Sequence, residues 1–399
     1  MVFALSACNA AVGAGGTELS QGLVNIALGK PYAFGSPPNY GLCTDVDDTT
    51  QLTDGAYTKG LFWCDKRTVG WGGQRVTVTI DLGTVQPVRG VSYNTAAGAA
   101  EVLWPELILV MVSDDAKTYY VAGDLVALSA ENGTPPAEGH YAVHRYWTDQ
   151  LATHGRFVKL VIEKRGPYTF VDEIEVYRGD DAWVGQPRTG LKSEDTMALH
   201  KQALMTLHVR QRLRDDLKAV RGMLKNAAGK EQLERELAGI EQLIPGVQAP
   251  PLEGFRAILP LNDLHKRIFA VQASVWRASG IKPLAEWQKN CWDMLSPTEP
   301  PLFGGAKVDL IMMKNEWRSA AFNLSNTGKS PAALRLSITG LPGGWNPKFI
   351  SVRDVPFTDT KSGVPVAAAL PEAKSDGTNY TTRGSDYYLR FGEQLEIPS

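Results

Sequence analysis

Residues 75–83, Arg-Val-Thr-Val-Thr-Ile-Asp-Leu-Gly, decide the fold of the first part of this chain. Apolar side chains stand at positions 76, 78, 80 and 82, polar side chains stand between them, and Gly83 ends the run. Successive side chains of a strand point to opposite faces, so this alternation puts one face in a core and the other toward water. The stretch therefore predicts a strand of an antiparallel sheet that is packed on one side only.

Similar short runs follow on the C-terminal side and are separated by turn residues. They predict strands at residues 88–94, 106–113, 118–122, 141–147, 156–163 and 170–177. Residues 107–112 are apolar on both faces, which predicts a central strand. Short strands at this spacing, without a long helix between them, are typical of a β-sandwich or a β-barrel.

The size and charge of the chain restrict its class. With 399 residues, 43% of them hydrophobic, the chain is long enough for two or three domains with cores of their own. The formal net charge of -2, without a stripe of lysine and arginine, predicts no nucleic-acid partner. No apolar run reaches the roughly 18 residues of a membrane-spanning helix, so we expect no transmembrane segment.

Six motifs in order resemble the discoidin domains, also called coagulation factor V/VIII type C domains, which include many bacterial carbohydrate-binding modules. The motifs are Asn-Ile-Ala-Leu-Gly-Lys-Pro at 25–31, Leu-Thr-Asp-Gly at 52–55, Val-Gly-Trp at 69–71, Val-Thr-Ile-Asp-Leu-Gly at 78–83, Val-Met-Val-Ser-Asp-Asp-Ala-Lys-Thr at 110–118 and Val-Asp-Glu-Ile-Glu-Val-Tyr at 171–177. The resemblance covers about residues 23–180. It implies a galactose-binding-like jelly roll with a ligand site in the loops at one end.

The same resemblance implies a structural calcium ion. By position, its side-chain ligands are Asp54 from the Asp-Gly turn, Thr58 a few residues on, and Glu173 from the last strand. Calcium takes six to eight oxygen ligands, and a turn-rich loop can supply the remaining ones as backbone carbonyls. The alternative is that Asp54 is a turn residue and Glu173 an exposed strand carboxylate.

Sugar sites in such domains use aromatic rings, which stack on the apolar face of a pyranose, and polar side chains, which bind its hydroxyl groups. The candidates are Trp63, Trp71, Trp104, Arg145 and Tyr168. Each has an alternative role in core or loop packing, and for Trp71 we favour that role because Val-Gly-Trp belongs to the fold's own signature. The long acidic and glycine-rich segment 32–50 departs from the compact sugar-binding members, so a standard galactose site is not assured.

The cysteines and the N-terminus bear on the compartment. Cys43 and Cys64 are either a disulfide, which would close a loop of about 20 residues and contribute roughly 3 kcal/mol, or two free thiols; we favour the disulfide. The spacing of apolar residues around Cys291 predicts a buried thiol on a helix. Leu-Ser-Ala-Cys at 5–8 resembles the lipobox of bacterial lipoproteins, which implies a lipid anchor at Cys8 and a signal sequence that is incomplete here. The alternative is a disordered small-residue tail.

The pattern changes near residue 180. Apolar residues three and four apart predict helices that begin after Ser193, run to Gly229, and continue over 233–244, 262–280 and 283–295. Their interleaved charges indicate solvated outer faces. After the proline-rich linker 296–302, strands are expected at 307–313, 319–324, 333–338, 349–355 and 387–391. Residues 323–338 resemble immunoglobulin-like sandwiches of extracellular bacterial proteins, and the strand pattern at the last residues predicts C-terminal truncation.

We therefore expect a mainly β fold with an α-helical insert. Its parts are a tail at 1–22, a discoidin-like jelly roll at 23–180, a helical bundle or spacer at 190–296 and an immunoglobulin-like β-sandwich at 303–399. No nucleophile elbow, phosphate loop or zinc-protease motif occurs in the chain.

The leading functional hypothesis is a non-catalytic module, outside the cytoplasm of a bacterium, that binds a glycan or cell-surface polysaccharide as the accessory region of a larger carbohydrate-active protein. The alternatives are adhesion through protein binding and, less favoured, glycoside hydrolysis within this chain, because paired carboxylates cannot be recognised from sequence spacing.

Overall fold

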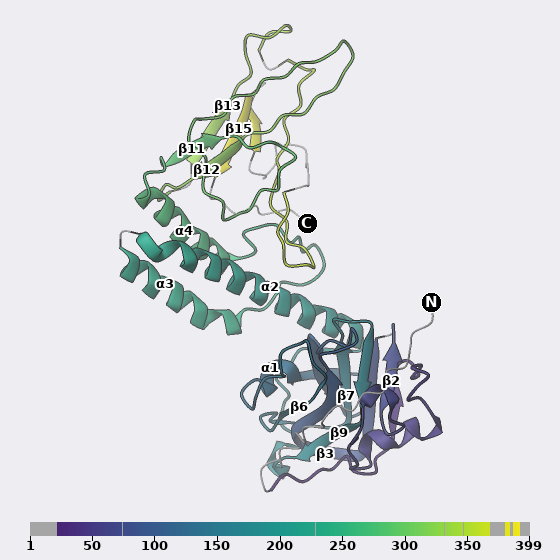
Figure 1. Ribbon diagram of the computed structural model, residues 1–399. Coiled ribbons are helices and arrows are strands. Elements are labelled where there is room, and N and C mark those ends of the chain that lie inside the picture. The colour runs from purple at the N-terminus through teal and green to yellow at the C-terminus, as the bar shows by residue number, and fades with distance from the viewer. Residues whose placement is uncertain are drawn as a thin grey trace. The chain divides into compact units, whose positions relative to one another are not determined.

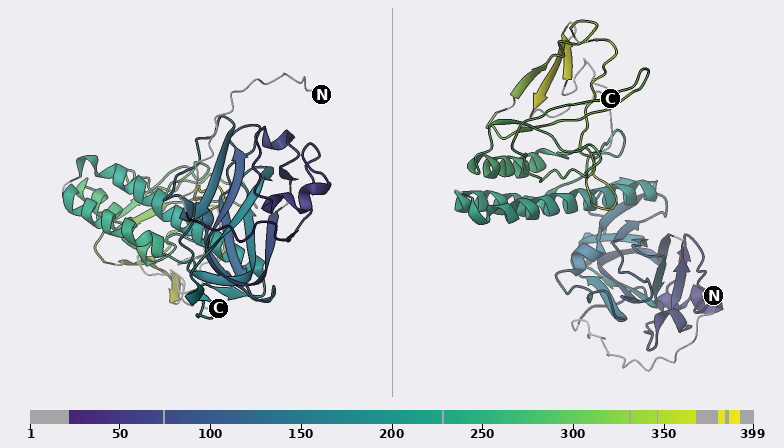
Figure 2. Two further views of the ribbon diagram at one scale, coloured as in Figure 1. Left: turned by 90° about the horizontal axis from the view of Figure 1, so that it is seen from below. Right: turned by 45° about the horizontal axis from the view of Figure 1, so that its top comes forward.

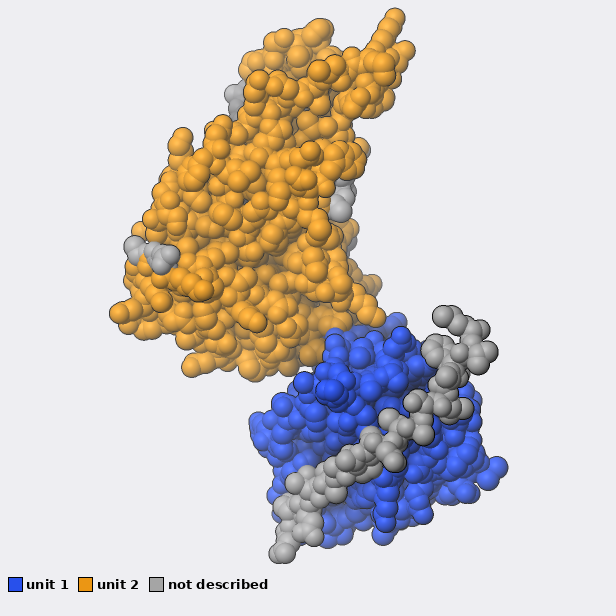
Figure 3. Space-filling model, viewed as in Figure 1, with its two compact units in different colours: residues 1–204 blue, residues 205–399 orange. Residues whose placement is uncertain are grey.

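A computed structural model describes residues 22–73, 75–227, 229–330, 332–345, 347–367, 380–383 and 386–391 of the chain. Two compact units divide the chain, residues 1–204 and residues 205–399 (Figure 3). The first unit is built from strands, and the second contains helices followed by two small sheets (Figure 1). The mainly β fold class expected from the sequence is confirmed. Cys8 lies outside the described residues.

The strands of the first unit form a large antiparallel sheet and a smaller pair. They are β1 (Tyr32–Phe34), β2 (Val69–Gly72), β3 (Val76–Ala97), β4 (Leu107–Ser113), β5 (Tyr119–Asp124), β6 (Ala142–Thr148), β7 (Thr153–Glu163), β8 (Tyr168–Val171), β9 (Glu173–Arg178) and β10 (Lys192–Ser193). The order is β1-β3-β7-β4-β5-β10, with β6 and β9 also paired to β3, while β2 pairs with β8. Short helices connect them: η1 (Val46–Thr49), η2 (Gln51–Thr53), η3 (Phe62–Cys64), α1 (Leu125–Ser129) and η4 (Asp181–Trp183).

The two parts of the long strand β3 pair with different strands of the large sheet. Its first part, residues 76–81, pairs with β1 and β7, and its last part, residues 88–97, pairs with β6 and β9. The register shifts between Asp81 and Gln86, where the strand turns the corner. Gly90 is required in this corner, because an added Cβ would lie 1.8 Å from the carbonyl oxygen of Thr148. The sequence predicted two strands here, and the structure joins them into one.

The alternation in the first part of β3 is confirmed. Val76, Val78, Ile80 and Leu82 are buried in the core, and the residues between them are half-buried. Strand β4 is buried at every position and lies between β7 and β5, as expected of a central strand.

The two ends of the sandwich are formed by different loops. At the first, which we call the loop end, the segments 36–44, 59–68, 98–106, 134–141 and 164–168 meet. They are joined by hydrogen bonds such as Gly139 N–H to Gly98 O (2.8 Å), Trp104 Nε1–H to Pro136 O (2.8 Å) and Tyr141 Oη–H to Gly60 O (3.1 Å). At the second, which we call the corner end, the β3 corner meets segments 148–152 and 178–183.

Three helices follow the sandwich: α2 (Thr196–Met223), α3 (Lys230–Leu243) and α4 (Asp263–Ala278). The first begins three residues later than Ser193, because Asp195 accepts from the backbone N–H groups of Met197 and Ala198. Arg221 of α2 pairs with two glutamates of α3, Glu234 at 2.7 Å and Glu241 at 2.9 Å, so these helices lie side by side (Figure 2). The predicted apolar stripes are buried between the helices.

The sequence indicated that the charged residues of this bundle face solvent. Some of them are buried instead. Arg212 and Asp216 of α2 are buried and pair at 2.8 Å, and His265 of α4 lies with Nε2 2.8 Å from the same aspartate. Leu261 donates its backbone N–H to His265 Nδ1, so the imidazole donates from Nε2 to Asp216. Arg212 also donates to the Gly363 carbonyl. This network joins α2, α4 and the segment near residue 360.

The predicted fourth helix is wrong. Residues 284–287 form β11 (Leu284–Trp287), which pairs with β12 (Asn323–Asn326). Trp287 is buried and donates to Ser325 Oγ, so the apolar residues of this segment serve a strand and not a helix face. Cys291 is consequently exposed, whereas a buried thiol was predicted.

The last third of the chain has few regular elements among its described residues. β13 (Ala332–Leu336), β14 (Tyr380–Arg383) and β15 (Asp386–Phe391) form a three-stranded sheet, close to two of the predicted strands. The predicted strands at 307–313 and 349–355 are absent, and the expected one at 319–324 begins only at Asn323. The immunoglobulin-like assignment is therefore not confirmed.

Cys43 and Cys64 are free thiols, so the favoured disulfide is not formed. Cys43 is buried and its Sγ faces Gly70, where an added Cβ would lie 2.6 Å from the sulfur. Cys64 ends η3 and is exposed. Burial raises the pKa of Cys43 to about 12, which keeps it a thiol at neutral pH.

None of the helices in the described ranges is long and apolar enough to cross a membrane.

Candidate functional site

A cluster of aromatic rings lies at the loop end of the sandwich. Its members, which we call the aromatic cluster, are Tyr40, Trp63, Tyr141, Tyr168 and Phe170. Phe170 is buried, and Tyr40 and Trp63 contact it with ring centroids 4.9 and 6.0 Å away. Tyr168 packs edge-on against Tyr40 at 5.4 Å, and Tyr141 packs edge-on against Trp63 at 4.9 Å. The four outer rings are half-buried, so each keeps part of its surface in water.

Glycines let these rings approach the backbone. Strand β2 pairs with β8 so that Gly70 lies opposite Phe170 and Gly72 opposite Tyr168. A Cβ at Gly70 would lie 2.9 Å from the Phe170 ring, so only glycine fits beneath it. The Val-Gly-Trp-Gly sequence of β2 is thus needed for packing under the aromatic cluster.

Trp63 is held in place by its neighbours in η3. Phe62, next to it, is fully buried and anchors the short helix in the core. The Tyr141 hydroxyl donates to Gly60 O at 3.1 Å and accepts from Phe62 N–H at 3.4 Å. The Trp63 ring is therefore fixed on two sides, which reduces the entropy lost when a ligand stacks on it.

Polar side chains stand on the same loops. Asn39 accepts from Gly72 N–H at 2.8 Å and donates to Gly72 O at 3.1 Å. Glu138 and Arg165, from two different loops, pair at 3.0 Å, and His140 is exposed nearby in sequence. Aromatic faces beside amide, carboxylate and guanidinium groups are the combination that binds a sugar ring and its hydroxyl groups.

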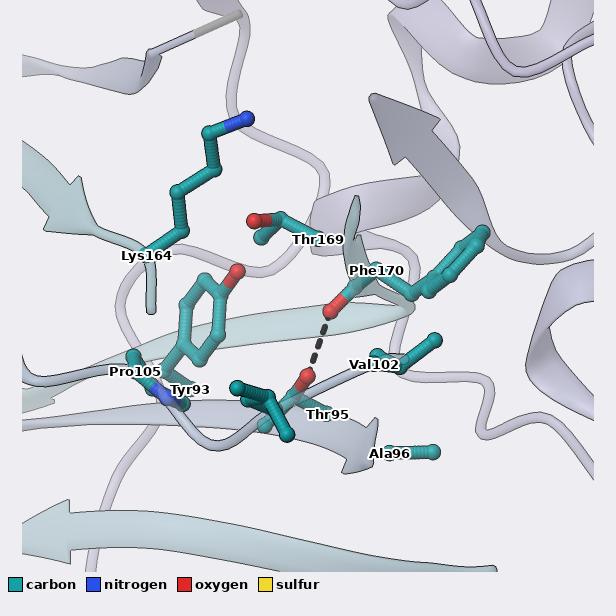
Figure 4. Close-up of a pocket in the computed structure, with 9 residues that line it drawn as sticks. Tyr93, Thr95, Ala96, Val102, Pro105, Lys164, Thr169 and Phe170 are labelled. Carbon is teal, nitrogen blue, oxygen red and sulfur yellow. Dashed lines mark hydrogen bonds between the residues drawn. The ribbon is translucent and has the colours of Figure 1, made fainter. Parts of the chain in front are cut away.

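A small cavity lies between the sheets at this end (Figure 4). Its volume is about 10 Å³, and Tyr93, Thr95, Lys164 and Thr169 are among its lining residues. The Tyr93 hydroxyl points into it and has no hydrogen-bond partner among the described residues, whereas Thr95 donates to Phe170 O at 2.6 Å. This volume suits about one water molecule. A molecule as large as a pyranose does not fit inside it.

Two of the predicted sugar-binding tryptophans are core residues. Trp71 is 1% exposed and its indole donates to Ser36 O at 2.9 Å, as its alternative role required. Trp104 is 5% exposed and its indole donates to Pro136 O. Neither ring offers a face to a ligand, because both rings are used to hold loops onto the core.

Arg145 lies on β6, away from the loop surface. Its guanidinium pairs with Glu175 of β9, donates to Tyr177 Oη at 3.0 Å and lies over the Tyr57 ring at 5.1 Å. Tyr57 in turn donates to Glu175 at 2.9 Å. This network joins the 53–58 loop to the outer face of β6 and β9, so Arg145 stabilises the fold and is not among the groups near the aromatic cluster.

Glu173 is a buried carboxylate with an unused oxygen. Its Oε2 accepts from Gly55 N–H at 3.2 Å, and its Oε1 is buried without a hydrogen-bond partner in the described part of the chain. Burial raises the pKa of Glu173 to about 9, and the nearby carboxylates Glu175, Asp54 and Asp172 add to the rise. Either a proton or a bound cation would offset the free-energy cost of burying the negative charge of Glu173.

The other two predicted calcium ligands lie in the loop beside Glu173. Asp54 precedes Gly55 and its Oδ1 accepts from Ala56 N–H at 2.7 Å. Thr58 places its hydroxyl 3.0 Å from Thr68 Oγ1 and donates its N–H to Asp172 at 2.7 Å. The Asp54 carboxylate is close enough to Glu173 to add to the rise in its pKa, and the Thr58 hydroxyl already has a partner. No group of three or more His, Cys, Asp or Glu side chains in the described ranges could hold a metal ion.

Sequence reasoning missed Tyr40 and Tyr141 as members of the aromatic cluster. Tyr141 was counted only as part of a strand, and Tyr40 lies in the 32–50 segment that departs from compact members of the family. The available signal was their place in loops that precede glycine-rich or strand segments. Tyr40 reaches Tyr168 and Phe170 because its backbone N–H donates to Gly70 O of β2, which pairs with β8.

No family model matches this chain, and no curated protein matches it. Solved structures of carbohydrate-binding modules do match. A fucose-binding module of Streptococcus pneumoniae is 16% identical, with 41% of this chain and 100% of that chain covered and a TM-score of 0.27. A chitosan-binding module from a chitosanase/glucanase of Paenibacillus sp. IK-5 is 20% identical, with 39% and 98% covered and a TM-score of 0.25. A Clostridium perfringens module in complex with GalNAc-β-1,3-galactose is 15% identical, with 39% and 99% covered and a TM-score of 0.25.

Proposed function

We propose that this protein binds a glycan at the loop end of its β-sandwich, through the aromatic cluster. The observation that carries the proposal is the set of four half-buried rings that pack on Phe170 directly or through one another, on loops that also carry Asn39 and the Glu138–Arg165 pair. Rings that are fixed yet partly exposed cost little entropy to use, and they match the apolar face of a pyranose. Trp63 links Phe170 to Tyr141, as Tyr40 links Phe170 to Tyr168.

The role is one of binding, in the accessory part of a larger carbohydrate-active protein. Such a module raises the concentration of an attached enzyme at a polymer, which strengthens overall binding through multivalency. The discoidin-like motifs of residues 25–177 support this role. Its place outside the cytoplasm of a bacterium rests on the lipobox-like Leu-Ser-Ala-Cys at 5–8, since the disulfide that would have added support is not formed.

A structural calcium ion is the second part of the proposal. Glu173 and Asp54 would supply carboxylate oxygens, and carbonyl groups of the 53–58 loop would complete the six to eight ligands that calcium prefers. The orphaned Oε1 of Glu173 supports this, because a buried carboxylate oxygen without a partner is costly. When bound, the ion would supply positive charge to Glu173. The protein's own contribution would be to tie the 53–58 loop to β9.

Saturation-transfer NMR on the whole chain tests the binding role. The probes are fucose, GalNAc-β-1,3-galactose, the Lewis b tetrasaccharide and chitosan oligosaccharides, added to wild-type protein and to Trp63→Ala. We expect transfer to at least one probe and at least a tenfold loss of affinity in the variant, about 1.4 kcal/mol. Trp292→Ala is the matched control, since Trp292 is 90% exposed and outside the sandwich. Equal binding by Trp63→Ala would place the ligand elsewhere.

A further inference from the structure

A groove of about 600 Å³ lies at the corner end of the sandwich, opposite the loop end. Its walls include Arg89, Asp149, Gln150, Arg178, Asp180 and Trp183. These residues come from β3, from the segment between β6 and β7, and from the end of β9 with η4. The volume is within the range of small-molecule sites, whereas the cavity at the loop end holds about one water molecule.

The backbone fixes the walls of this groove. Leu151 N–H donates to Arg89 O at 2.7 Å, and Gly179 N–H donates to Pro87 O at 2.9 Å. Gly90 packs directly against the Thr148 carbonyl, as described above. The three segments are therefore joined at the corner of β3, and the groove exists before any ligand arrives.

Trp183 lies in the groove with its ring seated on a glycine. An added Cβ at Gly179 would be 2.2 Å from Cζ3 of the indole, so the ring lies directly against the backbone there. Asp180 begins η4 by accepting from Ala182 N–H at 2.9 Å, and Trp183 N–H donates to Asp180 O at 3.0 Å. The side chain is half-buried, and its indole N–H makes no hydrogen bond to another described residue. The ring is thus held in one position, and its indole N–H can donate to a ligand.

Both arginines of the groove are already paired within the protein, and the Asp180 carboxylate accepts from the N–H of Ala182. Arg89 donates to the Asp149 carboxylate at 3.1 Å and to its carbonyl at 3.3 Å. Arg178 donates to Gln86 at 2.6 Å and pairs with Asp181. The guanidinium and carboxylate charges offset one another, so no excess of one sign attracts an ionic ligand. Both arginines remain exposed and keep further N–H groups for neutral acceptors.

We propose that this groove is a second saccharide-binding site, which takes a neutral pyranose or a short neutral oligosaccharide. The Trp183 ring would stack on the apolar face of the sugar, and the paired side chains Arg89 and Asp149 would donate to and accept from its hydroxyl groups. The site shares no residue with the aromatic cluster. It therefore stands or falls independently of binding at the loop end, and the two sites together would let one module contact two parts of a polysaccharide.

Fluorine NMR of the whole chain labelled with 5-fluorotryptophan tests this site. The Trp183 resonance is assigned by its absence from Trp183→Phe, and the probes are methyl β-galactoside, methyl α-fucoside, methyl α-mannoside, cellotriose and tri-N-acetylchitotriose. We expect at least one probe to shift the Trp183 resonance saturably, in wild-type protein and equally in Trp63→Ala. The exposed Trp292 should not shift. A Trp183 resonance that no probe moves up to about 20 mM, where a millimolar site would be mostly filled, overturns the proposal.

A second variant separates ligand contact from folding. Arg89→Gln should keep the chemical shift of Trp183 in the free protein and weaken the saturable shift at least tenfold. An unchanged affinity in Arg89→Gln would contradict the hydrogen-bonding role given to this side chain and, with it, the proposed site. A shift at Trp63 without one at Trp183 would overturn this proposal and leave binding at the loop end standing. The reverse result would support this site and contradict the loop end.

Discussion

The β-sandwich and the segment 288–322 contain similar apolar runs, but the runs are buried in the sandwich and exposed in the segment. In the sandwich, Ile80 is fully buried at the centre of an alternating strand. In the segment, Ile311 is 93% exposed, and Phe303 and Trp317 are exposed as well, without any strand at 307–313. Alternation creates a strand only where neighbouring strands bury its apolar face, because an isolated strand gains too little to offset its lost entropy. Pairing partners therefore decide the outcome, and a local pattern cannot supply them.

The contrast between the two regions would be wrong if Ile80 and Ile311 contributed equally to stability. Ile80→Ala should destabilise the sandwich by about 2–5 kcal/mol, because it removes buried methyl groups and leaves a cavity. Ile311→Ala is the matched substitution and should change stability by less than about 0.5 kcal/mol. Amide hydrogen exchange measures the effect of Ile80→Ala across residues 76–97 and that of Ile311→Ala across residues 284–326. A comparable loss of protection in the two variants would contradict the burial that separates these regions.

Calcium should separate the two regions further, because it should stabilise the sandwich and leave the segment 288–322 unchanged. With calcium about 100-fold above its Kd, the first unit should gain about 2.7 kcal/mol over the chelated protein. Glu173→Gln should abolish most of this gain, since it removes a buried carboxylate ligand. Glu138→Gln is the control, as Glu138 is exposed and paired with Arg165 at the loop end. A thermal unfolding temperature of the wild-type protein that is the same with calcium and with chelator would contradict the proposed calcium site.

Acid should also weaken the first unit through one histidine. His200 is fully buried, and burial together with Arg75 lowers its pKa to about 4, despite Glu163 Oε2 at 3.4 Å. The unfolded chain takes up a proton at His200 near pH 6.5 and the folded chain does not, so the contribution of His200 to stability falls as the pH drops from 6.5 to 4, whereas Glu173, whose pKa is raised in the folded chain, contributes in the opposite direction. The loss should be on the order of 2 kcal/mol. This loss of stability should be smaller in His200→Gln and unchanged in the exposed control His140→Gln. Denaturant unfolding at each pH measures it, and identical pH profiles for the two variants would refute the assignment to His200.

Local patterns predicted the elements whose partners are close in sequence or dictated by strong alternation. The strand at 75–83, the central strand β4 and three of the four helices were foreseen in this way. The prediction of the fourth helix was wrong because the spacing of its apolar residues also fits a strand, and β11 pairs with β12, which lies more than 30 residues later in the chain. The disulfide failed because Gly70, 27 positions after Cys43, accommodates that thiol in the core.

The candidate site was only partly foreseeable for the same reason. Trp63 and Tyr168 were named as aromatic residues of expected loops, and Asp54 and Glu173 from the motifs of the resemblance; their roles in binding stay predictions. Trp71 and Trp104 look the same in sequence, but their indoles hold Ser36 and Pro136 and are buried. Tyr40 and the Trp183 groove depend on contacts across the sandwich, which no local spacing encodes.

The most direct test of the central claim is a glycan array of the whole chain, with calcium and with chelator, beside Trp63→Ala. We expect binding to particular glycans that weakens when calcium is removed and, for glycans bound at the loop end, falls at least tenfold in the variant. Binding to no glycan under either condition would contradict the account, and the loop end would then have to be examined for a protein partner.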